Sequence, residues 1–242
     1  MDREIYDRMR EVERDHWWFS ARREILADQI AGLGLPAGAE ILEAGCGAGG
    51  NLQMLSRFGR VRAVEPDEAS RIHAGRDGVE VLAGLLPDRL PHFDVAFDLV
   101  AAFDVIEHVE EDAAAVAALA ALLKPGGRMI ATVPANAWMW SRHDVLHHHK
   151  RRYDLGRFRR LFEEAGLQVE KASYFNMLLF PLVSAVRLLK PLVGGKGPAD
   201  DAMPSPAANA VLRRMFAAEK VLLNRFDLPF GVSILLAARR PT

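Results

Sequence analysis

The chain contains 242 residues, half of them hydrophobic, and its 31 basic and 32 acidic residues leave a formal net charge of −1. This length suits one large α/β domain with an ample core. The lack of a basic excess argues against a mainly electrostatic nucleic-acid binder, so we expect no nucleic acid among the partners. The single cysteine, Cys46, excludes an internal disulfide framework and is typical of a reducing compartment.

The N-terminal stretch is charged throughout and has no apolar signal-peptide core. No apolar run approaches the ~18 to 20 residues that a membrane-spanning helix needs. We therefore expect a cytoplasmic protein.

Predicted strands and helices alternate along the chain. A helix is expected over 2–32. The charged residues of this stretch are interrupted by an aromatic cluster at 16–19. Proline and glycine at 125–127 are expected to end a helix. The alternation favours a parallel sheet covered by helices on both faces. Strands are predicted at 40–44, 61–64, 79–82, 97–103, 128–133, 167–174 and 232–238, and helices at 51–58, 67–76, 110–123 and 209–226.

A glycine-rich turn follows the first predicted strand. Gly45, Gly47 and Gly50 permit a tight turn and close approach of a ligand to the backbone. Glu65 ends the next strand, 20 residues beyond Gly45, where an acid can accept hydrogen bonds from ribose hydroxyls. This pattern alone fits a nicotinamide-binding domain as well as a methyltransferase. Glu43 favours the second, because its carboxylate would repel a pyrophosphate but could pair with the ammonium group of S-adenosylmethionine.

Four segments, at 41–49, 64–66, 97–109 and 123–127, stand in the order and spacing of a known family. Over roughly residues 14–175 the chain resembles class I S-adenosylmethionine-dependent methyltransferases of the ubiquinone-biosynthesis-like group. The resemblance implies a Rossmann-like, seven-stranded, mostly parallel sheet with an antiparallel strand seven and a helical insert before it. We expect a single domain over 1–242, made of an N-terminal helical lid (1–38), a cofactor-binding core (39–174), the insert (175–231) and the last strand (232–242).

The resemblance also implies S-adenosylmethionine as the cofactor, with Glu43 and the glycine turn near its methionine part and Glu65 on its ribose. Family members often carry Gly-Asp after strand three, but this chain has Gly84 followed by two leucines. Adenine would then be recognised by main-chain groups and by packing against apolar side chains. The expected cofactor residues are His16, Arg22, Glu43, Ala44, Gly45, Cys46, Gly47, Asn51, Glu65, Pro66, Leu85, Leu86, Phe103, Asp104, Val105 and His108.

Methyl transfer to oxygen benefits from a general base. The candidates are His108, His143, Asp144 and the run 147–149, of which His108 and His143 are favoured equally. The loop at 138–153 combines aromatic, imidazole and basic side chains at the rim where ligands collect. A solvated basic turn is the alternative. The adjacent histidines at 147–149 invite a metal interpretation, but consecutive residues rarely converge on one ion, so we expect no metal. The predicted acceptor-binding residues are Trp138, Trp140, His148, Arg151 and Tyr153.

The insert opens with an apolar stretch at 175–186, followed by Arg187 and Lys190. It is too short to span a bilayer. Either it roofs an apolar pocket at the substrate entrance, or residues 175–190 contact the inner face of the membrane, or it forms an ordinary buried helical pair with 209–226. We therefore expect O-methylation of a small or lipid-linked acceptor. A non-catalytic binding protein and an NAD-dependent oxidoreductase are the alternatives.

Overall fold

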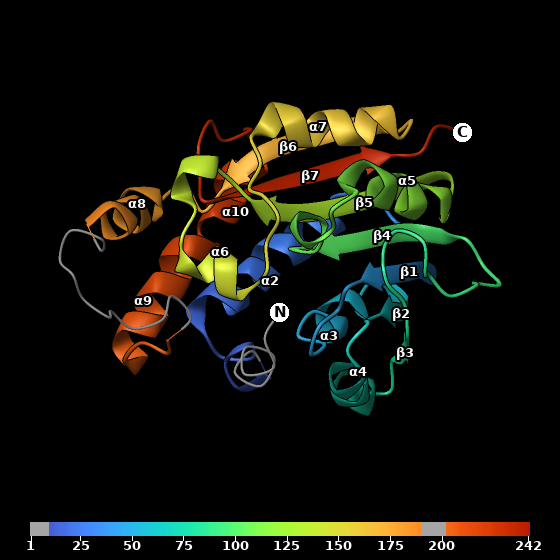
Figure 1. The fold of residues 1–242 in the computed structure, drawn as a ribbon, viewed down its shortest axis with the longest axis horizontal. Helices are drawn as coiled ribbons and strands as arrows, with labels where there is room; N and C mark the ends of the chain where they lie inside the picture. The colour runs from blue at the N-terminus through green and yellow to red at the C-terminus, as the bar shows by residue number, and fades with distance from the viewer. Residues whose placement is uncertain (1–9, 190–201) are drawn as a thin grey trace.

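In a computed structural model, residues 10–189 and 202–242 are described, and they fold around one seven-stranded sheet (Figure 1). The strand order is β3-β2-β1-β4-β5-β7-β6. Strand β7 is antiparallel to β5 and to β6, and the other pairs are parallel, which confirms the predicted topology. The strands are β1 Ala39–Ala44, β2 Gly59–Val64, β3 Glu80–Leu82, β4 Phe97–Phe103, β5 Leu123–Pro134, β6 Gln168–Phe175 and β7 Ser233–Arg239.

Helices cover both faces of the sheet because its central strands are apolar on both sides. The helices are α2 Trp17–Ala31, α3 Leu52–Leu55, α4 Glu68–Ala74, α5 Asp112–Ala121, α6 Arg142–Leu146, α7 Leu155–Glu164, α8 Phe180–Leu189, α9 Pro206–Ala217 and α10 Glu219–Leu223, with short 3-10 turns η1 Gly75–Asp77, η2 Ile106–His108 and η3 Ala137–Met139. In β4, Val100 and Ala102 face the core beneath α5 and α7, whereas Leu99 and Ala101 face the core beneath α2, α9 and α10.

Three predicted boundaries are wrong. The N-terminal helix is not continuous over its described part, because a turn at 13–16 separates residues 10–12 from α2, which His16 caps through its side chain. Residues 2–9 of that prediction lie outside the described residues. The helix expected at 51–58 shrinks to one turn, α3. Residues 124–127 do not follow a helix directly. They bulge out of β5, since Phe97 pairs with Leu123 and Leu99 with Arg128.

The insert contributes α8, α9 and α10, and the helix predicted at 209–226 is divided at Ala218. Helix α9 packs along α2. Asn209 Oδ1 accepts a hydrogen bond from the Trp17 N–H at 2.8 Å, and the rings of Trp18 and Phe216 lie 5.1 Å apart. The N-terminal helix and the insert therefore form one layer, which continues past the end of the sheet where α6, α8 and α9 gather (Figure 1).

Candidate functional site

The turn after β1 is built so that backbone, rather than side chains, faces a ligand. Gly45 and Gly47 adopt φ values of 69° and 55°, in the left-handed region that favours glycine. A Cβ on Gly45 would lie 2.6 Å from Cγ2 of Val105, whereas one on Gly47 would meet nothing within 4 Å. The turn is thus packed against the loop after β4 on one side and open on the other.

Glu65 holds this turn in place from the end of β2. Its Oε2 accepts a hydrogen bond from the Gly47 N–H at 2.9 Å, and its Oε1 accepts one from the Asp67 N–H at 2.9 Å. A carboxylate offers about four acceptor positions, so each oxygen can accept a further hydrogen bond from a ligand hydroxyl. Burial raises the pKa of Glu65, although the two main-chain N–H groups oppose the shift.

Beneath the turn, Glu43 and Asn51 leave polar atoms unsatisfied. Asn51 Nδ2 donates to Glu43 Oε1 at 2.8 Å, while Glu43 Oε2 and Asn51 Oδ1 have no hydrogen-bond partner among the described residues. Burial raises the pKa of Glu43 to about 8. Such unpartnered buried atoms are costly. A ligand ammonium group at Asn51, which lines a cavity, would lower that cost.

Two cavities meet at the glycine turn and share Gly45, Gly47, Asp104 and His108 in their walls. The second, of about 490 Å³, is lined by predicted cofactor residues: Ala44, Glu65, Pro66, Leu85, Leu86 and Val105. The first, of about 420 Å³, is lined by the others: His16, Arg22, Cys46, Asn51 and Phe103. Glu43 lines neither. Both volumes lie in the range of small-molecule sites.

An ion pair in the lining of the first cavity connects the N-terminal helix α2 to the loop after β4. Arg22, almost fully buried, pairs with Asp104, whose Oδ1 also accepts a hydrogen bond from Thr132 Oγ1 at 3.0 Å. Asp104 has a φ of 56°, which a non-glycine residue rarely adopts. Strained backbone of this kind persists where the surroundings fix it, and it is common at functional sites.

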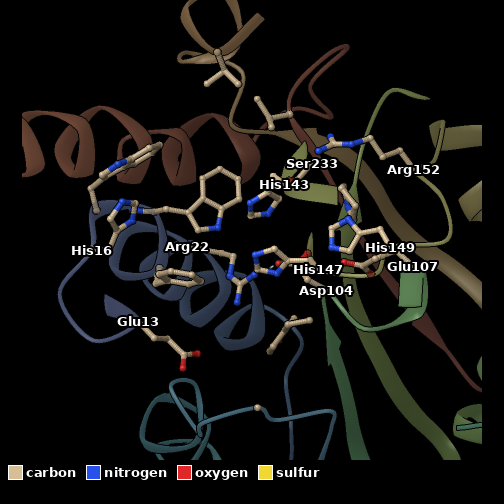
Figure 2. A pocket seen from close by; sticks show the side chains of 18 of the residues that line it. Glu13, His16, Arg22, Asp104, Glu107, His143, His147, His149, Arg152 and Ser233 are labelled. Carbon is tan, nitrogen blue, oxygen red and sulfur yellow. Dashed lines mark hydrogen bonds and ion pairs between the residues drawn. The ribbon is translucent and has the colours of Figure 1, made fainter. Parts of the chain in front are cut away.

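Imidazoles form the opposite wall of the first cavity (Figure 2). His143 and His147 stack with ring centroids 4.0 Å apart, and His108 lies edge-to-face with His149 at 4.7 Å. Burial lowers the pKa of His108 to about 3 and that of His143 to about 2. Both rings are therefore neutral near pH 7, and both are weaker bases than a solvated imidazole.

Asp144 lies outside the first cavity and holds the histidine side chains that line it in place. Its Oδ1 accepts from Arg152 Nε at 2.8 Å and lies 2.9 Å from Nδ1 of His149, and its Oδ2 accepts from the Ser141 N–H at 2.8 Å as part of a capping box on α6. The guanidinium and imidazole partners hold the pKa of Asp144 far below its usual range. Asp144, His147 and His149 belong to the loop at 138–153, which the sequence identified as a source of candidate bases, whereas Glu107 lies outside that loop and was not predicted as a site residue.

The predicted acceptor residues do not reach either cavity. Tyr153 lines neither cavity, because its side chain is fully buried between α5 and α7 and its hydroxyl donates to Asp112 Oδ2 at 2.9 Å. Arg151 pairs with the same carboxylate at 2.7 Å. Trp138 and Trp140 are exposed outside the cavities, and His148 occupies a left-handed turn that lines neither of them.

Replacing Tyr153 by phenylalanine should therefore lower the free energy of unfolding by only about 0.5–1.5 kcal/mol, the net value of one hydrogen bond, since Asp112 keeps its arginine partners. Turnover per folded molecule should stay at the wild-type value. Chemical denaturation and a steady-state assay measure the two quantities. A Tyr153→Phe protein that stays folded but loses turnover would return Tyr153 to the reaction site.

Side chains of the insert line the first cavity. Leu179, Leu182, Val183 and Val186 from and before α8, with Leu212 of α9, form an apolar wall facing the histidines. Arg187 joins the lining and donates through Nη1 to the Met139 carbonyl at 2.5 Å, which ties α8 to the loop after β5. The insert thus lies at the carboxyl ends of β4 and β5.

Comparisons with known proteins agree with this geometry. A family model described as a methyltransferase domain matches residues 18–172. A Mycolicibacterium smegmatis protein named as a probable S-adenosylmethionine-dependent methyltransferase is 31% identical over 164 residues, which cover 66% of this chain and 62% of that protein. The ubiquinone biosynthesis O-methyltransferase of Xylella fastidiosa (strain M23) is 33% identical over 128 residues, or 47% of this chain and 52% of that protein. The matches thus span only about half to three-fifths of these relatives' length.

Solved structures show the same fold. An S-adenosylmethionine-dependent methyltransferase from Thermotoga maritima has a TM-score of 0.62 at 18% identity, covering 98% of this chain and 95% of that one. Phosphoethanolamine N-methyltransferase 2 of Haemonchus contortus, solved with S-adenosylmethionine, has a TM-score of 0.52 at 20% identity, covering 85% and 49%. Since the family model spans more than half of the chain, the protein belongs to the methyltransferase-domain family, among the class I S-adenosylmethionine-dependent methyltransferases.

Proposed function

We propose that this protein transfers a methyl group from S-adenosylmethionine to a hydroxyl oxygen of a small acceptor with an apolar or lipid-like part. The proposal depends chiefly on one observation, which is that the two cavities share part of their lining. A cofactor bound at the glycine turn and an acceptor bound by the insert would meet at this shared part. The cofactor supplies a methyl group already activated by its sulfonium. Positioning and exclusion of water then provide much of the rate.

The residues present fit this cofactor. Gly47 leaves room for a ligand against the backbone, Glu65 has acceptor positions to spare, and Asn51 presents an unsatisfied oxygen above the buried Glu43. Pro66, Leu85 and Leu86 supply the apolar contacts expected for adenine in place of a family aspartate. Nothing in this arrangement favours the nicotinamide alternative.

The acceptor side of the cavity supports an apolar substrate. Its roof is formed by aliphatic side chains of α8 and α9, and its wall by neutral imidazoles that can accept a hydrogen bond from a hydroxyl. The curated relatives that carry the name ubiquinone biosynthesis O-methyltransferase support oxygen as the accepting atom.

The test is methyl transfer to phenols and catechols that carry alkyl chains, with the product's added mass and methylated atom determined by mass spectrometry. Val183→Asp, which places a charge in the apolar roof, should lower kcat/KM for the alkylated acceptors, whereas Val221→Asp on the exposed side of α10 should not. Cofactor binding without product from any hydroxyl acceptor would favour the non-catalytic alternative.

We further propose that the cavity mouth contacts a lipid surface. No helix in 10–189 and 202–242 is long and apolar enough to cross a membrane. Around α8, however, Leu178, Leu182 and Val186 are 41–56% exposed, and Trp138 and Phe230 add aromatic surface. Clustered exposed apolar side chains mark interaction sites. Lys190, part of the predicted contact, lies outside the described residues.

The double variant Leu178→Asp/Leu182→Asp should lose most of its sedimentation with phosphatidylcholine vesicles, because two carboxylates cannot enter the interface without a large desolvation cost. Ile72→Asp on α4, at an equally exposed position remote from α8, is the matched control and should sediment as the wild type does. Equal sedimentation of all three proteins, or none, would contradict the proposed lipid contact.

A further inference from the structure

Three potential metal ligands lie close together in the lining of the first cavity, where the acceptor is proposed to bind. Glu107 and His108 belong to η2 after β4, and His149 comes from the loop after α6. One ligand atom from each lies within 4.8 Å of those of the other two. The Lys150 N–H donates to the Glu107 carbonyl at 2.8 Å and so joins the two segments. Figure 2 shows Glu107 and His149 side by side at the cavity wall.

Glu107 is an unusual residue to find there without a partner. Its side chain is fully buried, and neither carboxylate oxygen has a hydrogen-bond partner among the described residues. A buried carboxylate with no partner is strongly disfavoured unless a ligand satisfies it.

The two imidazoles are oriented as metal ligands usually are. Nδ1 of His149 faces Asp144 Oδ1 at 2.9 Å, which leaves the lone pair of Nε2 available. Asp144 is itself held by Arg152, so the ring is fixed by the carboxylate–histidine arrangement typical of metal sites. His108 forms a hydrogen bond with the main chain of His148, which orients its ring.

We propose that Glu107, His108 and His149 bind a divalent first-row transition-metal ion. Two imidazoles and one carboxylate are a ligand set found in catalytic zinc sites and in iron sites with open positions. The sequence predicted no metal, because the consecutive residues 147–149 were not expected to converge on one ion. The structure combines one of these with a distant Glu-His pair instead.

The role of the ion rests on the proposed function. Methyl transfer to a hydroxyl oxygen requires removal of the hydroxyl proton. A cation at this site would polarise the hydroxyl and lower its pKa, and the proton would leave to water. The oxygen electron pair then forms the new C–O bond as the C–S bond of the cofactor breaks, which leaves the neutral thioether.

The test uses the full-length protein, stripped of metal, without a histidine tag. Titration with Co²⁺ should develop the visible absorption of a protein-bound ion at one equivalent per chain, and Zn²⁺ should displace it. Glu107→Gln and His149→Ala should each weaken Co²⁺ binding by at least about 10- to 100-fold, the range seen even for residues behind the ligands. Thermal unfolding confirms that the variants are folded.

His143→Ala is the control within the cavity, since this residue lies outside the three-ligand cluster, and His92→Ala is the control at an exposed position. Both should bind Co²⁺ as the wild type does. Absence of Co²⁺ binding, or binding that Glu107→Gln and His149→Ala leave unchanged, would overturn the metal site. Titration with S-adenosylmethionine in the absence of metal separates the two proposals, because loss of that binding would argue against the proposed function alone.

Discussion

Replacing Asp144 by alanine should lower the free energy of unfolding by about 3–5 kcal/mol, the usual cost of removing one partner from a buried ion pair. The side chain of Arg152 is 2% exposed and would keep its charge without a counterion, while His149 would lose the acceptor that orients it. Helix α6 would also lose its capping box. Urea denaturation followed by circular dichroism measures the change.

Asp154→Ala is the matched control, because Asp154 caps α7 through a hydrogen bond of 2.8 Å from the Arg157 N–H but is exposed. Loss of such a cap should cost only about 1 kcal/mol. If both substitutions cost the same, Asp144 does not carry the buried network that fixes the histidine wall.

Because of the same network, we expect part of the free energy of unfolding to be lost in acid. The pKa of Asp144 is lower in the folded protein than the roughly 3.9 of an unfolded chain, so its stabilisation is fully present above that value. It should diminish as the pH falls below about 4 and approaches the folded pKa. In Asp144→Asn this part of the pH dependence should be absent.

Replacing Glu65 by alanine should weaken S-adenosylmethionine binding by about 1–3 kcal/mol, or roughly 5- to 150-fold. The substitution removes two charge-supported contacts to the turn, from the Gly47 and Asp67 N–H groups, together with the proposed ribose acceptor. Isothermal titration calorimetry measures the affinity. Glu68→Ala, an exposed acid on the following helix, should leave it unchanged. Wild-type affinity in a folded Glu65→Ala protein would count against this ribose site.

The fold was largely predictable because the signals for it are local. Apolar runs such as 97–103 allow burial on both faces of a sheet, and the structure uses both faces of β4. Gly45, Gly47 and Glu65 are likewise predictable, since strand ends and turn geometry fix their positions. The turn at 13–16 and the bulge at 124–127 were not, because tertiary packing decides where such segments bend.

For the part of the site proposed to bind the acceptor, the sequence predicts the loop involved but not which of its side chains face the cavity. Composition singled out 138–153, but the short helix α6 and the Asp144 network decide which of its side chains face inward. They turn His143, His147 and His149 toward the cavity, while the pairing of Ala135 with Tyr153 directs Tyr153 into the α5–α7 core. No periodicity in the sequence links Glu107 to His149, because their proximity depends on the packing of two loops from different strands.

The most direct test of the central claim is a crystal structure with S-adenosylhomocysteine bound. We expect its ribose at Glu65, its adenine among Pro66, Leu85 and Leu86, and its sulfur facing the cavity shared by the glycine turn, the histidines and α8. That placement would put the transferable methyl group beside the proposed acceptor. A sulfur atom facing away from this cavity, or a ligand bound elsewhere on the chain, would contradict the account.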